Sequence, residues 1–128
     1  MSFANSSISG GRLGIELIRS LLFSSISSTY AGITSVPLIN SARVVCFTNL
    51  TNSNLFVAVT PGNTPASDGT ADQVIVPANG FKLIDVTTNR LDTVPLSLAA
   101  GTRLWARTAT GSSNPTSGFI YAEVFYGY

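Results

Sequence analysis

The sequence predicts an all-β fold, in the form of an antiparallel, jelly-roll-like β-sandwich of seven to nine strands. From residue 43 onward, short apolar runs alternate with period two and are separated by turn residues, which is typical of antiparallel strands. The chain has 128 residues, enough for one hydrophobic core and too few for two. We therefore expect one domain, in which residues 1–40 form an extended N-terminal arm or the first strands and residues 41–128 form the body of the sandwich.

Residues 13–23 fit two kinds of secondary structure. Leu13, Leu17 and Leu21 share one face of a helix, but the apolar residues of the same segment also fit a strand broken by Arg19. The glycines near its start and the Ser-, Thr- and Ile-rich stretch after it favour extended structure. Extended structure is therefore the prediction, with a helix as the alternative.

The next runs predict a central strand and a hairpin. Residues 43–48 are apolar on both faces, which favours a central position in a sheet. Residues 55–60 alternate in polarity, and the polar cluster 49–54 between the two runs predicts a hairpin turn. Residues 61–72 hold two prolines, two glycines and no large apolar side chain, so we expect an exposed loop.

A second hairpin is predicted between residues 73–78 and 81–86. The dipeptide Asn79-Gly80 between them tolerates positive φ at both central positions of a type I′ turn. Pro77 has no N–H to donate to a ladder, which indicates a sheet edge or a strand end.

Three runs complete the sandwich. Residues 94–98 and 103–108 are both predicted strands, and the second separates the apolar Leu104 and Ala106 from a face that carries two arginines around a tryptophan. We expect that face to be solvated or at an interface. Residues 119–126 are apolar on both faces and predict a C-terminal central strand.

The composition limits the classes of partner. Seven Lys+Arg against six Asp+Glu give a net charge of +1, and charged residues make up 10% of the chain. This balance does not build the basic surface that nucleic-acid binding requires, so we expect no nucleic-acid partner. No stretch approaches about 18 uninterrupted apolar residues, so we expect no membrane span. A surface rich in Ser, Thr and Asn suits packing against neighbours.

The residues that usually carry catalysis are scarce. The chain has no histidine and a single cysteine, which excludes Ser-His and Cys-His nucleophiles and histidine metal ligands. We expect a non-enzymatic protein without cofactor or metal, in which Cys46 is a buried, chemically silent apolar residue. Asp68 and Asp72 are interpreted as solvated loop residues, and Asp85 and Glu123 as salt-bridged or solvated carboxylates rather than an acid–base pair.

Aromatic and arginine residues are the best candidates for a binding surface. Trp105 lies between Arg103 and Arg107, an arrangement that suits stacking with a sugar or a base, or packing at a subunit contact. The subunit contact is the preferred interpretation, because these residue types are enriched at interfaces. The tyrosines near the C-terminus are interface anchors or ordinary core and rim residues. The candidate interface therefore comprises Trp105, Arg103, Arg107, Tyr121, Tyr126 and Tyr128.

Several motifs occur in an order that resembles a known group of proteins. They are Ala42-Arg43-Val44-Val45, Phe47-Thr48-Asn49 with Thr51, Val76-Pro77-Ala78-Asn79-Gly80-Phe81, Asp85-Val86-Thr87-Thr88-Asn89-Arg90, Ser117-Gly118-Phe119-Ile120-Tyr121 and Tyr126-Gly127. The chain resembles the small all-β structural proteins of tailed bacteriophages, and the resemblance implies a virion component with no catalytic residues.

We therefore expect a non-enzymatic virion protein of a tailed bacteriophage, either an accessory capsid (decoration or cement) protein or a neck or tail component. Its expected partners are itself, as a homo-oligomer, and other virion proteins such as the major capsid or neck and tail proteins, and its expected location is the virion. The alternative is a host-surface glycan-binding module of a tail or fibre, built from turns 49–54, 61–72 and 111–118. Aromatic residues in those turns would favour the alternative, and the turns have none.

Overall fold

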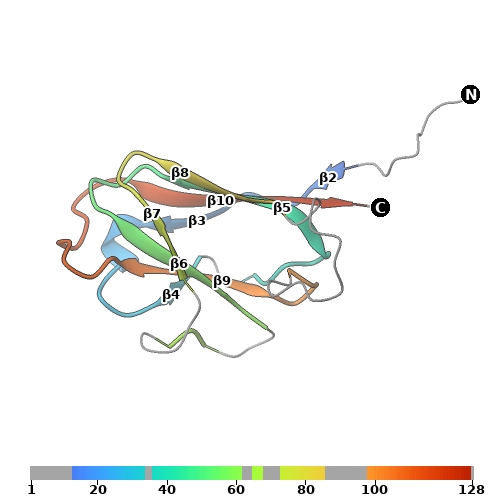
Figure 1. Ribbon diagram of the computed structural model, residues 1–128, viewed down its shortest axis with the longest axis horizontal. Helices are drawn as coiled ribbons and strands as arrows, with labels where there is room; N and C mark the ends of the chain where they lie inside the picture. Colours follow the sequence, from blue (N-terminus) through green and yellow to red (C-terminus); the bar gives the residue numbers. More distant parts are fainter. Residues whose placement is uncertain (1–12, 34–35, 62–64, 68–72, 86–97, 128) are drawn as a thin grey trace, which may run out of the picture.

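The fold is a sandwich of two antiparallel sheets, seen edge-on in Figure 1. The structure is a computed structural model that describes residues 13–33, 36–61, 65–67, 73–85 and 98–127. One sheet has the strand order β2-β10-β5-β8, with β3 also paired to β10, and the other has the order β4-β9-β6-β7. We refer to them as the β5/β10 sheet and the β6/β9 sheet.

The strands are short, as the sequence pattern predicts. Their bounds are β2 Leu13–Ile15, β3 Arg19–Leu22, β4 Ala31–Gly32, β5 Ala42–Asn49, β6 Leu55–Thr60, β7 Gln73–Val76, β8 Phe81–Asp85, β9 Arg103–Thr108 and β10 Phe119–Gly127, and a 3₁₀ turn spans Phe23–Ser25.

The chain passes repeatedly from one sheet to the other. After β3 in the β5/β10 sheet it enters β4 in the β6/β9 sheet, returns for β5, crosses again for β6 and β7, and continues to alternate through β8, β9 and β10. Because β2 and β3 occupy the same place beside β10, each sheet is four strands wide, and this winding between the two sheets is the jelly-roll arrangement. The predicted fold class is confirmed.

The core lies between the two sheets. Alternate residues of the central strands point inward and are fully buried, among them Val45 and Phe47 of β5, Val57 of β6, and Ile120 and Val124 of β10. Strands β5 and β10 are both central, as predicted, because each has a paired strand on either side. The predicted strand 94–98 lies outside the described residues except for Leu98, which is buried in the core.

The segment 13–22 is extended and not helical, which confirms the preferred prediction. Strands β2 and β3 both pair with β10. The strand is interrupted, but at residues 16–18 and not at Arg19, which begins β3 and faces the interior opposite Ala122. Ile26 and Ile33 are buried in the core, so the described residues after Leu13 belong to the sandwich.

The predicted hairpin across residues 49–54 is wrong, because β5 and β6 lie in opposite sheets. Asn49 explains the crossing: its buried side-chain amide donates to Ser53 O at 2.8 Å and to Val76 O, in the opposite sheet, at 3.0 Å. Its Oδ1 accepts from Thr51 N at 2.9 Å. A polar cluster predicts a turn, but these hydrogen bonds decide which sheet the chain enters next.

The predicted type I′ hairpin at Asn79-Gly80 is also wrong. Strand β7 is an edge of the β6/β9 sheet and β8 is an edge of the β5/β10 sheet, so the turn joins two sheets. It lies one residue earlier than predicted: Gly80 N donates to Pro77 O at 2.9 Å, and Asn79 alone of the central residues has positive φ, at 55°. Pro77 does follow the last residue of an edge strand, as expected.

Candidate functional site

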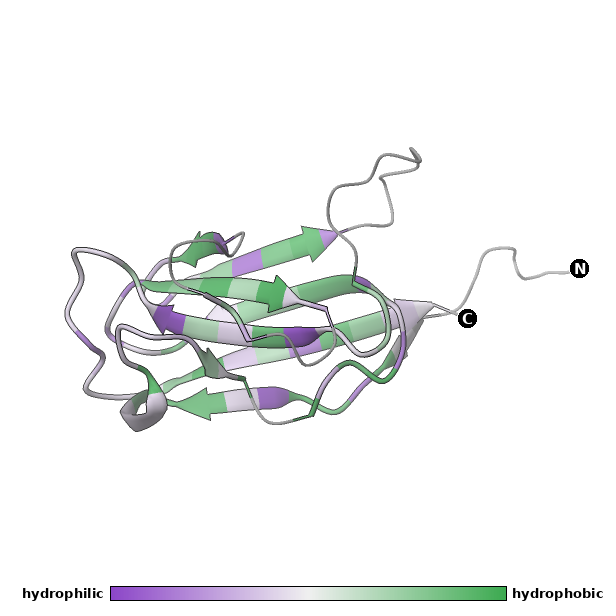
Figure 2. Ribbon diagram, turned by 90° about the horizontal axis from the view of Figure 1, so that it is seen from below, coloured by the Kyte–Doolittle hydropathy of each residue, from purple (hydrophilic) through white to green (hydrophobic). Residues whose placement is uncertain are grey.

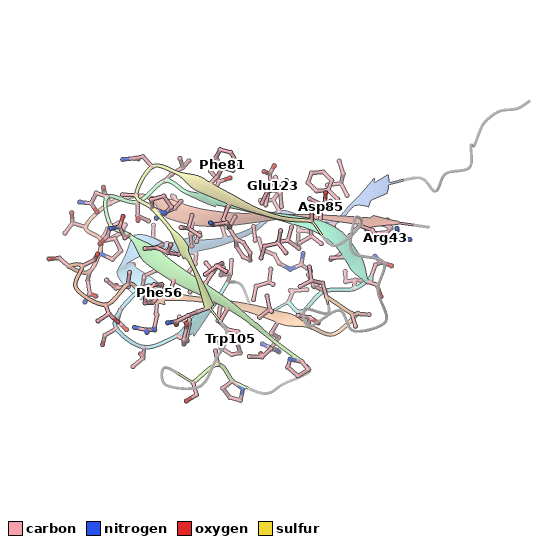
Figure 3. The ribbon with its side chains drawn as sticks, in the orientation of Figure 1. Arg43, Phe56, Phe81, Asp85, Trp105 and Glu123 are labelled. Carbon is pink, nitrogen blue, oxygen red and sulfur yellow. The ribbon has the colours of Figure 1, made fainter. Side chains whose placement is uncertain are left out.

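The candidate interface residues lie on opposite sides of the molecule. Because side chains alternate along a strand, Arg103, Trp105 and Arg107 point outward from the β6/β9 sheet, whereas Tyr121 points outward from the β5/β10 sheet. Figure 3 shows Trp105 on the side of the sandwich opposite Phe81 and Glu123. The candidate residues that the structure describes therefore do not form one surface.

Tyr126 belongs to neither of these two outer faces. Tyr126 lies opposite Gly14 in the ladder, and a Cβ at that glycine would overlap the tyrosine ring, so the absence of a side chain at position 14 makes room for it. Tyr128 lies outside the described residues.

Arg107 is held within its own chain. Its guanidinium lies 5.2 Å from the ring centroid of Tyr30 and 4.9 Å from that of Phe56, and only 8% of the residue is exposed. Its Nη2 donates to Gln73 Oε1 at 3.4 Å, and the Tyr30 hydroxyl donates to the same oxygen. The expectation that this side chain is solvated or at an interface is therefore wrong for Arg107: two aromatic rings and a carboxamide already surround it.

Trp105 has its one polar group satisfied by the same sheet. Its indole Nε1 donates to Thr60 Oγ1 at 2.7 Å. Its cross-strand neighbours are Gly32 on β4 and Ala58 on β6, whose small size leaves room for the indole over the sheet. Figure 2 views the molecule from the side of this sheet, whose strands are mostly coloured as hydrophobic with a few hydrophilic segments.

The outer face of the β5/β10 sheet has a different character. Large apolar side chains with few polar partners cover it, and we call them the apolar face: Ile15, Ile18, Leu22, Phe81, Leu83 and Phe119. Phe81 is 67% exposed and Leu83 is 52% exposed. The Phe119 and Tyr121 ring centroids are 5.6 Å apart, so these two rings form a continuous aromatic surface along β10.

A shallow recess lies within the apolar face. It has a volume of about 200 Å³ and is lined by Ile18, Thr48, Tyr121 and Glu123. Glu123 is half-buried, and no ion pair involves it among the described residues. The recess therefore offers one carboxylate within an otherwise apolar and hydroxyl-lined surface.

Glu123 and Asp85 do not form a paired-carboxylate site. Glu123 lies opposite Cys46 and Asp85 lies opposite Val44, so the whole of β5 separates the two acids. Neighbouring strands are about 4.8 Å apart, which places the two backbones about 10 Å from one another. This separation is consistent with the preference for separate carboxylates over an acid–base pair.

The prediction that Cys46 is buried in the core is wrong. The residue is partly exposed, and its side chain lies on the outer face of β5 between Glu123 and Leu83. Its Sγ is 3.9 Å from Thr48 Oγ1. The apolar neighbours in sequence suggested burial because the outer face of this sheet is itself apolar.

A buried ion pair escaped the sequence analysis. Arg19 Nη2 donates to Glu16 Oε1 at 2.9 Å, and both side chains are almost fully buried. Arg19 also donates to Val36 O and Pro37 O, while Glu16 Oε2 accepts from Asn40 N at 2.7 Å. Acid and base three residues apart in an apolar run were a usable signal, because a strand interior tolerates such charges only when they are paired.

The hydrogen bonds control the ionisation of Glu16. Burial by itself raises the pKa of this carboxyl, but the N–H groups of Asn40 and Ile39, the Asn40 side chain and Arg19 together hold the pKa below its ordinary value of 4.5. The pair thus fastens residues 36–40 to the connection between β2 and β3.

The described residues contain no cluster that could hold a metal ion, since no three metal-ligating side chains gather in them. A second recess, about 100 Å³ and lined by residues such as Phe47, Val57 and Ile84, opens between the sheets, and both recesses are smaller than the roughly 300–1,000 Å³ of typical small-molecule sites. The described elements also include no helix that is long and apolar enough to span a membrane.

Comparison with known proteins gave no relative: no family model, no curated protein and no solved structure matches this chain.

Proposed function

We propose that this protein is a non-enzymatic structural component of a tailed-bacteriophage virion, an accessory capsid or neck or tail protein that is held in place through its apolar face. The observation that carries this proposal is the exposure of that face. Its six large side chains are between 39% and 68% exposed. Such a surface is costly to leave in water and is stabilised when a protein partner covers it.

The size of the apolar face supports a protein partner. The six side chains together expose on the order of 600 Å². The largest patch on an ordinary monomer is about 300–600 Å², and one side of a stable protein interface buries about 800 Å². The face is thus at the upper limit for a monomer and close to the requirement of an interface.

The resemblance distinguishes a virion protein from a glycan-binding protein, whereas the fold does not. Jelly rolls occur both in viral capsid proteins and in lectins, so the architecture favours neither. The resemblance of the β5, β7–β8 and β10 motifs to small phage structural proteins favours the virion. The indole N–H of Trp105 donates to Thr60, so this group is not available to donate to a sugar.

Purified virions provide the test. Mass spectrometry of particles from the phage that encodes this chain should detect it in many copies per particle, and cryo-electron microscopy should locate jelly-roll density on the shell, neck or tail. Absence of the chain from purified particles would contradict the proposal. Specific binding to host glycans by a chain located on the tail or a fibre of the particle would instead support the glycan-binding alternative.

A further inference from the structure

The apolar face carries both members of a charge pair that do not meet within one molecule. Glu123 lies near its centre, on β10. Arg43 lies at its end, where β5 bulges between Val44 and Ala42, and it is exposed. A Cβ at Gly127 would lie 3.0 Å from Arg43 Nε. Because Gly127 is two residues beyond the outward-facing Phe125, this contact places the guanidinium on the outer side of the sheet.

The two charges are separated along the strands. Cys46 lies opposite Glu123, and Arg43 is three residues from Cys46, a displacement on the order of 10 Å at the usual rise per residue. No ion pair between them occurs in the described part of the chain. The cross-strand row of Phe125, Val44 and Asp85 lies between the two charges, and Asp85 has an interaction of its own within the chain.

We propose that a second copy of this chain packs on the apolar face, sheet against sheet, with Arg43 of each copy paired to Glu123 of the other. A two-fold axis between the copies, parallel to the sheets and perpendicular to their strands, reverses the order of the two charges along the strand. When this axis passes near the Val44 and Phe125 row, both Arg43–Glu123 pairs form at once, as a self-complementary interface requires. This inference rests on the proposed function, since it names the first partner of that face.

The free-energy cost of removing the Glu123 carboxylate from water indicates which partner covers the apolar face. Any apolar partner that covers the face also covers Glu123, and a carboxylate removed from water is tolerated only when a cation or several donors pair with it. The partner must therefore present a cation or several donors opposite an apolar surface, and the face of a second copy presents the cation.

Arg43 is the cation that the described chain can supply. Among the described basic residues, Arg19 is buried in its own ion pair, Lys82 alternates to the inner side of β8, and Arg103 and Arg107 belong to the opposite outer face. Sheets in face-to-face contact pack about 10 Å apart, a distance that an arginine side chain bridges.

A charge exchange tests the proposal. Sedimentation equilibrium should show that the wild-type chain self-associates, that Glu123→Arg and Arg43→Glu each raise the dissociation constant at least about tenfold, and that the double variant recovers most of the loss. Arg103→Glu makes the same charge change on the opposite outer face and should leave association unchanged. Circular dichroism of each variant separates weaker association from failure to fold.

The outcomes separate this inference from the proposed function. A chain that is monomeric at about 100 µM, or single variants that the double variant does not rescue, would overturn the proposed pairing. If such a chain is nevertheless present in virions, the proposed function stands and another virion protein covers the face. If the charge exchange succeeds but particles lack the chain, the pairing stands and the virion function fails.

Discussion

The two outer faces of the sandwich differ in whether their side chains already have partners within the chain. The β6/β9 face carries Trp105 and Arg107, the residue types that most often dominate protein interfaces. Both are bonded within the chain, to Thr60 and to Tyr30, Phe56 and Gln73. The β5/β10 face carries ordinary apolar residues that lack such partners and are half or more exposed at Phe81 and Leu83. A residue type thus indicates an interface only when its partners lie outside its own chain.

Cross-strand neighbours produce this difference. On the β6/β9 face, Phe56 lies directly opposite Arg107, and Gln73 on β7 reaches the same guanidinium from the next strand. On the β5/β10 face, Glu123 lies opposite Cys46, followed by Leu83, neither of which can neutralise a carboxylate. We therefore expect substitutions on the first face to change the free energy of unfolding and substitutions on the second to change association.

The two faces can be compared only if they belong to one cooperatively folded sandwich. The substitution with the largest expected loss of stability tests this. Glu16→Ala removes the carboxylate from Arg19, which is 1% exposed, and leaves a buried cation without its partner. Loss of one member of a buried pair costs about 3–5 kcal/mol. Urea denaturation should show this loss in a single transition monitored by both tryptophan fluorescence and circular dichroism. Two separate transitions would contradict a shared fold.

The Glu16–Arg19 pair also predicts how the stability of the protein falls at acid pH. The folded-state pKa of Glu16 is below its ordinary value of 4.5, so its contribution to stability is complete above that pH and disappears as the pH falls through the lower folded-state pKa. Denaturation midpoints measured between pH 7 and pH 3 should therefore fall less in Glu16→Gln than in the wild-type chain. An identical acid dependence in the two proteins would contradict this role.

Arg107→Ala should act on stability alone. It removes two cation–π contacts and the hydrogen bonds to Thr108 O and Gln73 from a residue that is 8% exposed, and we expect a loss of about 2–3 kcal/mol in the free energy of unfolding. Arg43→Ala, at an exposed arginine, is the matched control and should change it by less than about 0.5 kcal/mol. Equal losses in the two variants would remove the distinction between the faces.

A substitution at Trp105 tests whether the indole stabilises the folded chain. Trp105→Phe keeps an aromatic ring but removes the Nε1 donor to Thr60, and we expect a loss of about 1–2 kcal/mol. A double-mutant cycle with Thr60→Val should give a coupling energy near 1 kcal/mol. A coupling near zero, together with weaker self-association, would show that the tryptophan belongs to an interface.

Phe81→Ser should have the smallest effect on stability, within about 0.5 kcal/mol, because the side chain is 67% exposed. The same variant should weaken self-association, as an apolar contact is lost from the covered face. A large loss of stability in a monomeric preparation would mean that Phe81 supports the fold instead.

The sequence predicted the parts of this molecule that local patterns encode. Period-two alternation identified β5, β6, β9 and β10, and Pro77 marked the end of an edge strand. Turn residues do not encode which sheet follows, so both predicted hairpins failed where the side chain of Asn49 and the Pro77–Gly80 turn direct the chain across the sandwich. The division of the candidate residues between two faces depends on strand pairing, which no local pattern contains.

Cys46 provides the most direct measurement, since the only thiol of the chain lies at the centre of the apolar face, beside Glu123. The rate at which a thiol reagent labels the native protein should be measured over a range of protein concentrations. If a second copy covers this face, the labelling rate falls as the associated fraction rises, and Glu123→Arg abolishes the dependence. A rate that is the same at every concentration, while sedimentation shows association, would place the contact elsewhere and contradict the account.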